Sequence, residues 1–145
     1  MDYRSAFQVS AAGMAVEKLR VDVTSVNIAN VHSTRGADGK LFRPLRVVSQ
    51  EATVSFANTF RGMSLPALQG PRVTSVEPMD VAPRLVLEPG HPDADEKGFV
   101  SFPGVDQVGE MVNLMTAVRA YEANVIAMNV AKTLAVKTLD IGGNS

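Results

Sequence analysis

The first thirty residues carry apolar side chains at helical spacing on two faces. One series steps by three and four: Val9, Ala12, Val16, Leu19, Val23 and Val26. A second series steps by seven: Phe7, Met14, Val21 and Ile28. The pattern predicts a helix over residues 3–31, roughly 40 Å long at about 1.5 Å per residue. A helix with two apolar faces is typical of one that lies between neighbours.

The C-terminal segment repeats this pattern from residue 105 to about residue 141. One predicted stripe contains Val108, Met111, Met115, Val118 and Val125. The other contains Leu114, Ala117, Tyr121, Met128, Ala131 and Ala135. The closing Gly-Gly-Asn-Ser tail is predicted to stop this helix, because glycine is a common helix terminator.

The segment between the helices holds all eight prolines, which exclude a long helix there. Short extended pieces rich in valine, leucine, phenylalanine or threonine predict strands at 45–49, 53–56, 72–76, 84–88 and 99–102. Residues 57–71 lack periodicity and are predicted to form a loop. We therefore expect an N-terminal helical region at 1–36, a β-rich insert at 37–103 and a C-terminal helical region at 104–145.

The predicted fold class is mainly α with a small β-rich insert. We expect the terminal helices to pair as an antiparallel coiled coil through one stripe each. The second stripes, left exposed, would form an apolar surface too large for a monomer. They are predicted to pack against other subunits in a helical, tubular assembly.

Composition and charge exclude several classes of function. The net charge is −1 and is spread evenly, so no basic face indicates nucleic-acid binding. The absence of cysteine excludes disulfides and thiolate chemistry within the chain. We see no cleavable signal peptide in residues 1–20, where Asp2, Glu17 and Lys18 flank a short apolar run.

Two long motifs carry a family resemblance. The segment SAAGMAVEKLRVDVTSVNIANVHSTRG, residues 10–36, resembles the N-terminal signature of the flagellar rod and hook proteins. The segment EMVNLMTAVRAYEANVIAMNVAK, residues 110–132, resembles their C-terminal signature. The resemblance implies a subunit of the flagellar basal-body rod, which crosses the periplasm and transmits torque from motor to hook. It also implies export without a cleaved signal peptide, through the flagellar type III apparatus.

The partners implied by the resemblance are copies of the chain, other rod proteins, and the basal-body ring and export-gate region. No cofactor, nucleic acid or small-molecule substrate is expected. The alternative hypothesis is an autonomous helical adaptor or chaperone-like binding module, whose helices would fold in isolation.

The two motifs also supply candidate contact residues. Asn27 is interpreted as a buried amide that fixes register between helices or subunits, whereas Asn30 fits that role and a helix stop equally. Arg119, Tyr121, Glu122 and Asn124 are predicted to form a contact cluster between subunits. The full predicted interface comprises Met14, Leu19, Val23, Asn27, Ile28, Asn30, Met111, Met115, Arg119, Tyr121, Glu122, Asn124 and Met128.

One acidic cluster invites a metal hypothesis. The cluster comprises His91, Asp93, Asp95 and Glu96. Asp93 and Asp95 alternate as hard-cation ligands do, but the glycine and distal glutamate of a calcium loop are not at the required spacing. One histidine beside two carboxylates could also resemble a zinc site. We favour a turn between two strands. No nucleophile and base arrangement is recognisable, so the chain is not expected to be an enzyme.

Overall fold

The computed structural model describes residues 3–36, 38–51 and 70–143. The helices and strands are α1 (Tyr3–Ala29), β1 (Leu45–Glu51), β2 (Pro71–Pro78), β3 (Arg84–Leu87), β4 (Phe99–Phe102) and α3 (Gln107–Gly143). The mainly α architecture with a small β-rich insert is confirmed.

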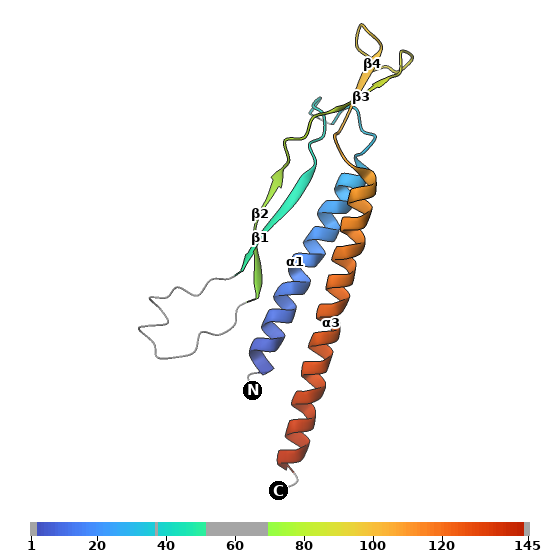
Figure 1. Cartoon of the computed structure of the whole chain (residues 1–145). Helices are drawn as coiled ribbons and strands as arrows, with labels where there is room; N and C mark the ends of the chain where they lie inside the picture. The colour runs from blue at the N-terminus through green and yellow to red at the C-terminus, as the bar shows by residue number, and fades with distance from the viewer. Residues whose placement is uncertain (1–2, 37, 52–69, 144–145) are drawn as a thin grey trace, which may run out of the picture.

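The two helices form an antiparallel pair, as predicted. Both chain ends lie at the same end of an elongated molecule (Figure 1), and the Tyr3 hydroxyl is 3.0 Å from Thr138 Oγ1. At about 1.5 Å per residue, α1 is roughly 40 Å long and α3 roughly 55 Å. The last turn of α3 therefore extends beyond the N-terminus of α1.

The strands form two separate antiparallel hairpins. β1 pairs with β2, with an irregularity in register between Val48 and Ser49. β3 pairs with β4, so that Leu87 lies opposite Phe99. Four of the five predicted strands are confirmed, and the fifth, at 53–56, lies outside the described residues.

The molecule has three layers in the order β1–β2, α1, α3 (Figure 1). Among the described helices and strands, α3 packs only against α1, whereas α1 packs against α3, β1 and β2. The first apolar stripe of α1 faces the hairpin, because Gly70 abuts Ala12 and Val9. The chain's own hairpin β1–β2 packs against α1 and covers part of this stripe, while Val26 at its end is 43% exposed.

The contact of α1 with α3 includes small and polar residues. The buried residues of α1 are Ser10, Gly13, Val16, Val23, Thr24 and Asn27. Of these, Gly13 lies against Asn124 of α3 and Asn27 bonds to Glu110 of α3. On α3, Ala117 and Ala131 of the second predicted stripe are buried, and Ala117 is fully enclosed, whereas Tyr121 of the same stripe is exposed. Small residues allow the helix backbones to approach closely. The pairing of the helices therefore depends on close contact between small side chains more than on interlocking large ones.

The C-terminal end of α3 lies two residues beyond the predicted end near residue 141. Helix α3 continues through Gly142 and Gly143, and Gly142 does not have the positive φ of a glycine cap. Positive φ occurs instead at Gly39 (77°), after α1, and at Gly98 (80°), in the loop between β3 and β4.

Candidate functional site

Asn27 lies where α1, β1 and α3 meet. Its side-chain amide donates to the Leu45 carbonyl at 2.8 Å and to Glu110 Oε2 at 3.0 Å. Its side-chain carbonyl accepts from the Leu45 amide at 2.8 Å. The residue is 1% exposed. One buried amide thus holds the start of the first strand and the first turn of α3 at fixed positions along α1.

The bond to Glu110 joins α1 to α3 within the chain, while a role of Asn27 between subunits stays a prediction. Asn30 behaves differently: its amide donates to the Val26 carbonyl of its own helix at 2.9 Å, and Ser33 donates to its side-chain oxygen at 3.2 Å. This geometry matches the helix-end interpretation of Asn30.

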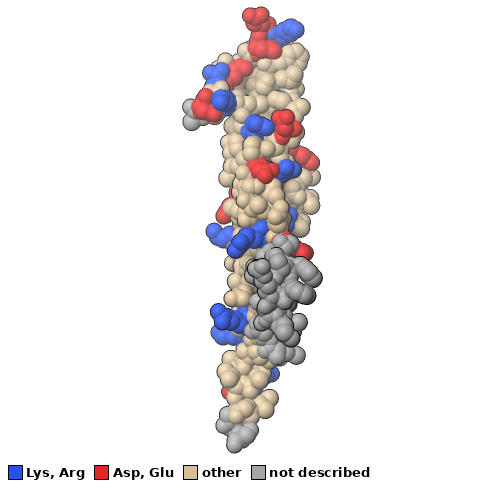
Figure 2. All heavy atoms as spheres, turned by 90° about the vertical axis from the view of Figure 1, so that its left-hand side faces the viewer, with Lys and Arg blue, Asp and Glu red and all other residues tan. Residues whose placement is uncertain are grey.

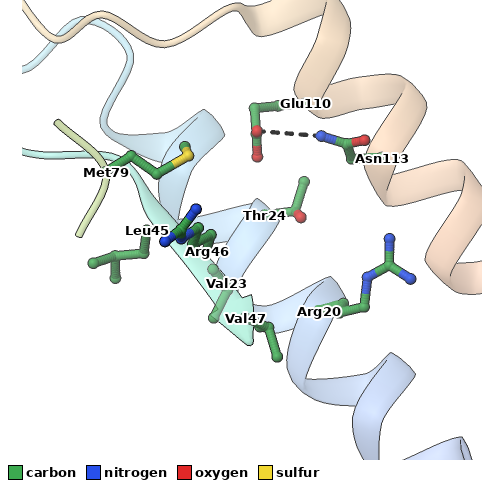
Figure 3. A pocket seen from close by; sticks show the side chains of 9 residues that line it. All are labelled: Arg20, Val23, Thr24, Leu45, Arg46, Val47, Met79, Glu110 and Asn113. Carbon is green, nitrogen blue, oxygen red and sulfur yellow. Dashed lines mark hydrogen bonds between the residues drawn. The ribbon is translucent and has the colours of Figure 1, made fainter. Parts of the chain in front are cut away.

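Sequence reasoning missed Glu110, the acidic residue of the first turn of α3. Its carboxylate accepts from Asn27 and, at 3.4 Å, from Asn113. It borders a cleft of about 180 Å³ together with Arg20, Val23 and Leu45 (Figure 3). A carboxylate at a helix N-terminus was the available signal, because the helix dipole favours negative charge there.

Gly13 and Asn124 mark the closest approach of the helices. A Cβ atom added to Gly13 would lie 2.7 Å from Asn124 Oδ1, too near for any other residue without movement. The Asn124 amide donates to the Ala120 carbonyl of its own helix at 2.9 Å. The structure therefore places Asn124 against α1 within the chain, away from the outer face.

The remaining residues of the predicted contact cluster point outward. Arg119 and Glu122 form an ion pair of 3.6 Å with side chains that are 84% and 56% exposed. Tyr121 is 37% exposed. An ion pair this exposed contributes little to the stability of the chain alone.

Exposed apolar side chains continue along the outer surface of α3. Those from its first half include Val108, Met111, Val112, Met115 and Val118, and Met115 is 65% exposed. Those from its second half include Ile126, Val130, Leu134, Val136, Leu139 and Ile141. We call this surface the outer face of α3. A helix that is apolar all round is normally buried, yet neither described helix is long and apolar enough to cross a membrane.

The other predicted interface residues are less accessible. Val23 is buried and borders the same cleft as β1 residues Leu45 and Val47. Met14, Leu19, Ile28 and Met128 are half-buried. The structure thus brings Met111, Met115, Arg119 and Glu122 to one exposed helix surface and places Val23, Asn27 and Asn124 in contacts within the chain.

Acidic residues in the loop between β3 and β4 have hydrogen-bond and ion-pair partners within the chain. Asp93 accepts from Thr34 Oγ1 at 2.8 Å and pairs with Arg35 at 3.0 Å. Asp95 accepts from the backbone amides of Lys97 and Phe99. No group of three or more potential metal ligands occurs in the described part of the chain. The loop instead ties the second hairpin to the turn that follows α1, as expected for a structural turn.

Known proteins are similar in sequence to this chain over nearly its whole length. Residues 96–141 match the family model described as flagellar basal body rod FlgEFG protein C-terminal. The flagellar basal-body rod protein FlgC of Escherichia coli O157:H7 is 38% identical over 136 residues, which cover 94% of this chain and 95% of that protein. FlgC of Bacillus subtilis (strain 168) is 36% identical over 94% of this chain and 96% of its own length.

FlgC of Aquifex aeolicus is 31% identical over 97% of both chains. The similarity therefore extends through both helices and the insert between them. The chain belongs to the family of the flagellar basal-body rod protein FlgC, whose members are non-enzymatic structural subunits of the rod.

Proposed function

We propose that this rod subunit self-assembles by packing the outer face of α3 against neighbouring subunits. The observation that supports this is the run of exposed apolar side chains along α3 from Val108 to Ile141. A contiguous apolar surface of this length is unusual on a soluble monomer and marks an interaction site. The hairpin β1–β2 already covers one side of α1, so α3 offers the larger free surface.

The proposed interface centres on Met111, Met115, Arg119 and Glu122. Methionine adapts its shape to irregular partners, and the Arg119–Glu122 pair would become less screened by solvent once covered. Met14, Leu19 and Ile28 flank the helix pair and would contribute at its margins. The half-buried Met128 would support the inner side of the same helix.

The proposed mechanism is mechanical. Torque on a shaft is shared among many lateral contacts, and heterologous contacts that do not close into a ring generate a helical tube. We further propose that the partners are copies of this chain and other rod proteins, with the basal-body ring and export gate at the rod base. Export by the type III apparatus to a periplasm-spanning position belongs to the same proposal.

A charge on the outer face tests this proposal. Met115→Glu should leave the fold intact, because an exposed substitution usually changes stability by less than about 0.5 kcal/mol. When a gene encoding this variant is the only source of the protein in its bacterium, swimming should be abolished or strongly reduced. Circular dichroism of the purified variant checks the fold, and soft-agar spreading checks function.

The matched control is Thr74→Glu, which adds the same charge at an exposed position on β2. Normal swimming with Met115→Glu, at normal protein level and normal helicity, would contradict the proposed interface. Equal defects in both variants would show that added charge alone impairs the rod.

A further inference from the structure

The methionines of this chain differ in how far solvent reaches them. The sequence has seven methionines and no cysteine, so thioethers are its only sulfur groups. Among the described residues, Met14, Met79 and Met128 are half-buried, whereas Met111 and Met115 are 47% and 65% exposed. A thioether is readily oxidised to a sulfoxide. Within the described part of the chain, Met111 and Met115 are therefore the sulfur sites that an oxidant reaches most easily.

These two methionines lie in an apolar part of the outer face of α3. They are four residues apart and so share one side of the helix. Their exposed neighbours are apolar: Val108, Val112 and Val118. From residue 107 to residue 118, Glu110 is the single charged residue. Figure 2 shows, by contrast, charged side chains of both signs on the side of the molecule where β1–β2 lies. A polar atom added at the methionines would change the character of their surface.

Oxidation by hydrogen peroxide adds such an atom. The thioether sulfur forms a bond to one peroxide oxygen, the O–O bond breaks, and the second oxygen leaves as water with both protons. Sulfur gives up two electrons, and the peroxide accepts them. The flexible apolar side chain becomes polar, which disrupts interfaces that contain methionine.

We propose that Met111 and Met115 form a reversible oxidation site that controls association of the free subunit. With both thioethers reduced, the outer face is buried against a neighbour. With sulfoxides in their place, the same burial removes polar oxygens from water and is disfavoured. Methionine sulfoxide reductases supplied with a dithiol reverse the change, because the dithiol is oxidised to a disulfide and the sulfoxide oxygen leaves as water. This inference rests on the proposed self-association and adds its regulation.

The site is tested first without reference to association. The full-length chain, dilute enough to be monomeric in sedimentation velocity, is treated with hydrogen peroxide, and tandem mass spectrometry follows sulfoxide at each methionine. Met111 and Met115 should be oxidised at least about threefold faster than Met14 and Met128, because susceptibility follows exposure. In urea the difference should disappear, since unfolding exposes every side chain. Equal rates in the folded chain would overturn the site.

Sedimentation velocity at higher concentration tests the control of association. Peroxide treatment should weaken association by about tenfold or more, and the two stereospecific sulfoxide reductases with dithiol should restore it. The double variant Met111→Leu/Met115→Leu retains apolar side chains without sulfur, so it should associate and stay associated after peroxide. The matched control Met14→Leu/Met128→Leu should remain sensitive to peroxide.

The outcomes separate this inference from the proposed interface. Unchanged association of a chain that carries sulfoxide at both positions would overturn the inference, as would peroxide sensitivity of Met111→Leu/Met115→Leu. The interface would still be supported in either case if Met115→Glu impairs swimming. An unoxidised chain that stays monomeric at every concentration would count against both.

Discussion

The buried amide of Asn27 supports the strongest stability prediction. Replacing Asn27 with leucine removes three hydrogen bonds, two to Leu45 and one to Glu110. A typical bond contributes about 1 kcal/mol and a bond to a charged group about 1.5–3 kcal/mol. Leu45 and Glu110 are half-buried, so water can reach them in part and reduce the loss.

We therefore expect Asn27→Leu to lower the free energy of unfolding by about 2–4 kcal/mol. At this chain length, that loss corresponds to a fall in Tm of roughly 10 °C. Leucine forms helices better than asparagine, so helix propensity cannot explain a loss. The measurement is urea unfolding monitored by circular dichroism. The unfolding midpoints are compared on condition that the dependence of the unfolding free energy on urea concentration is unchanged.

The matched control is Asn30→Leu, the same substitution three residues later. Asn30 bonds mainly within its own helix end, so the expected loss is below about 1 kcal/mol. In a Glu110→Ala background, the cost of Asn27→Leu should shrink, since one of its partners is already absent. An unchanged midpoint for Asn27→Leu, or equal effects at positions 27 and 30, would refute the reasoning.

Three further predictions concern the helix contact, the first hairpin and the second hairpin. Gly13→Val should destabilise the chain by about 1–3 kcal/mol through overpacking, measured as Tm, and Asn124→Ala in the same chain should recover part of the loss. The Ser75 hydroxyl and then Arg46 lower the pKa of Glu77, so its carboxylate favours the fold above its usual pKa and this contribution is lost as pH falls through the lowered value. Ser75→Ala should therefore raise the Glu77 pKa in a carboxyl-carbon NMR titration, and an unchanged value would exclude the hydroxyl as its cause. Asp93→Ala should speed hydrogen exchange in residues 91–98, because it removes the contacts to Thr34 and Arg35, while changing global stability by less than about 1 kcal/mol. Unchanged exchange would show that these contacts do not hold the loop.

Much of the architecture could be predicted from periodicity. The span of α1, the presence of α3 and the positions of four strands follow from local patterns. Strand pairing does not, because apolar alternation does not specify which strand is the neighbour. The pairing of β1 with β2, and the packing of this hairpin against α1, therefore could not be predicted from the sequence pattern.

In the candidate site, too, some features could be predicted from local sequence and others could not. Asn27 was recognisable as a buried amide in a helix, but its partners are 18 and 83 residues away in the sequence. Asn124 belonged to a family motif, yet only the close approach to Gly13 places it inside the helix pair. Contacts between distant segments depend on tertiary packing that local spacing cannot reveal.

The antiparallel helix pair has a consequence for the order of folding. Tyr3 and Thr138 contact each other across 135 residues, so the pair closes a loop that contains nearly the whole chain. The β1–β2 and β3–β4 pairings join segments much nearer in sequence. Pairing of distant segments costs more loop-closure entropy before any stabilising contact forms. We therefore expect the hairpins to form first and the helices to pair last. Before its final residues have been synthesised, the chain cannot complete the helix pair, so the side of α1 that faces α3 remains uncovered even if β1 and β2 already pack against α1.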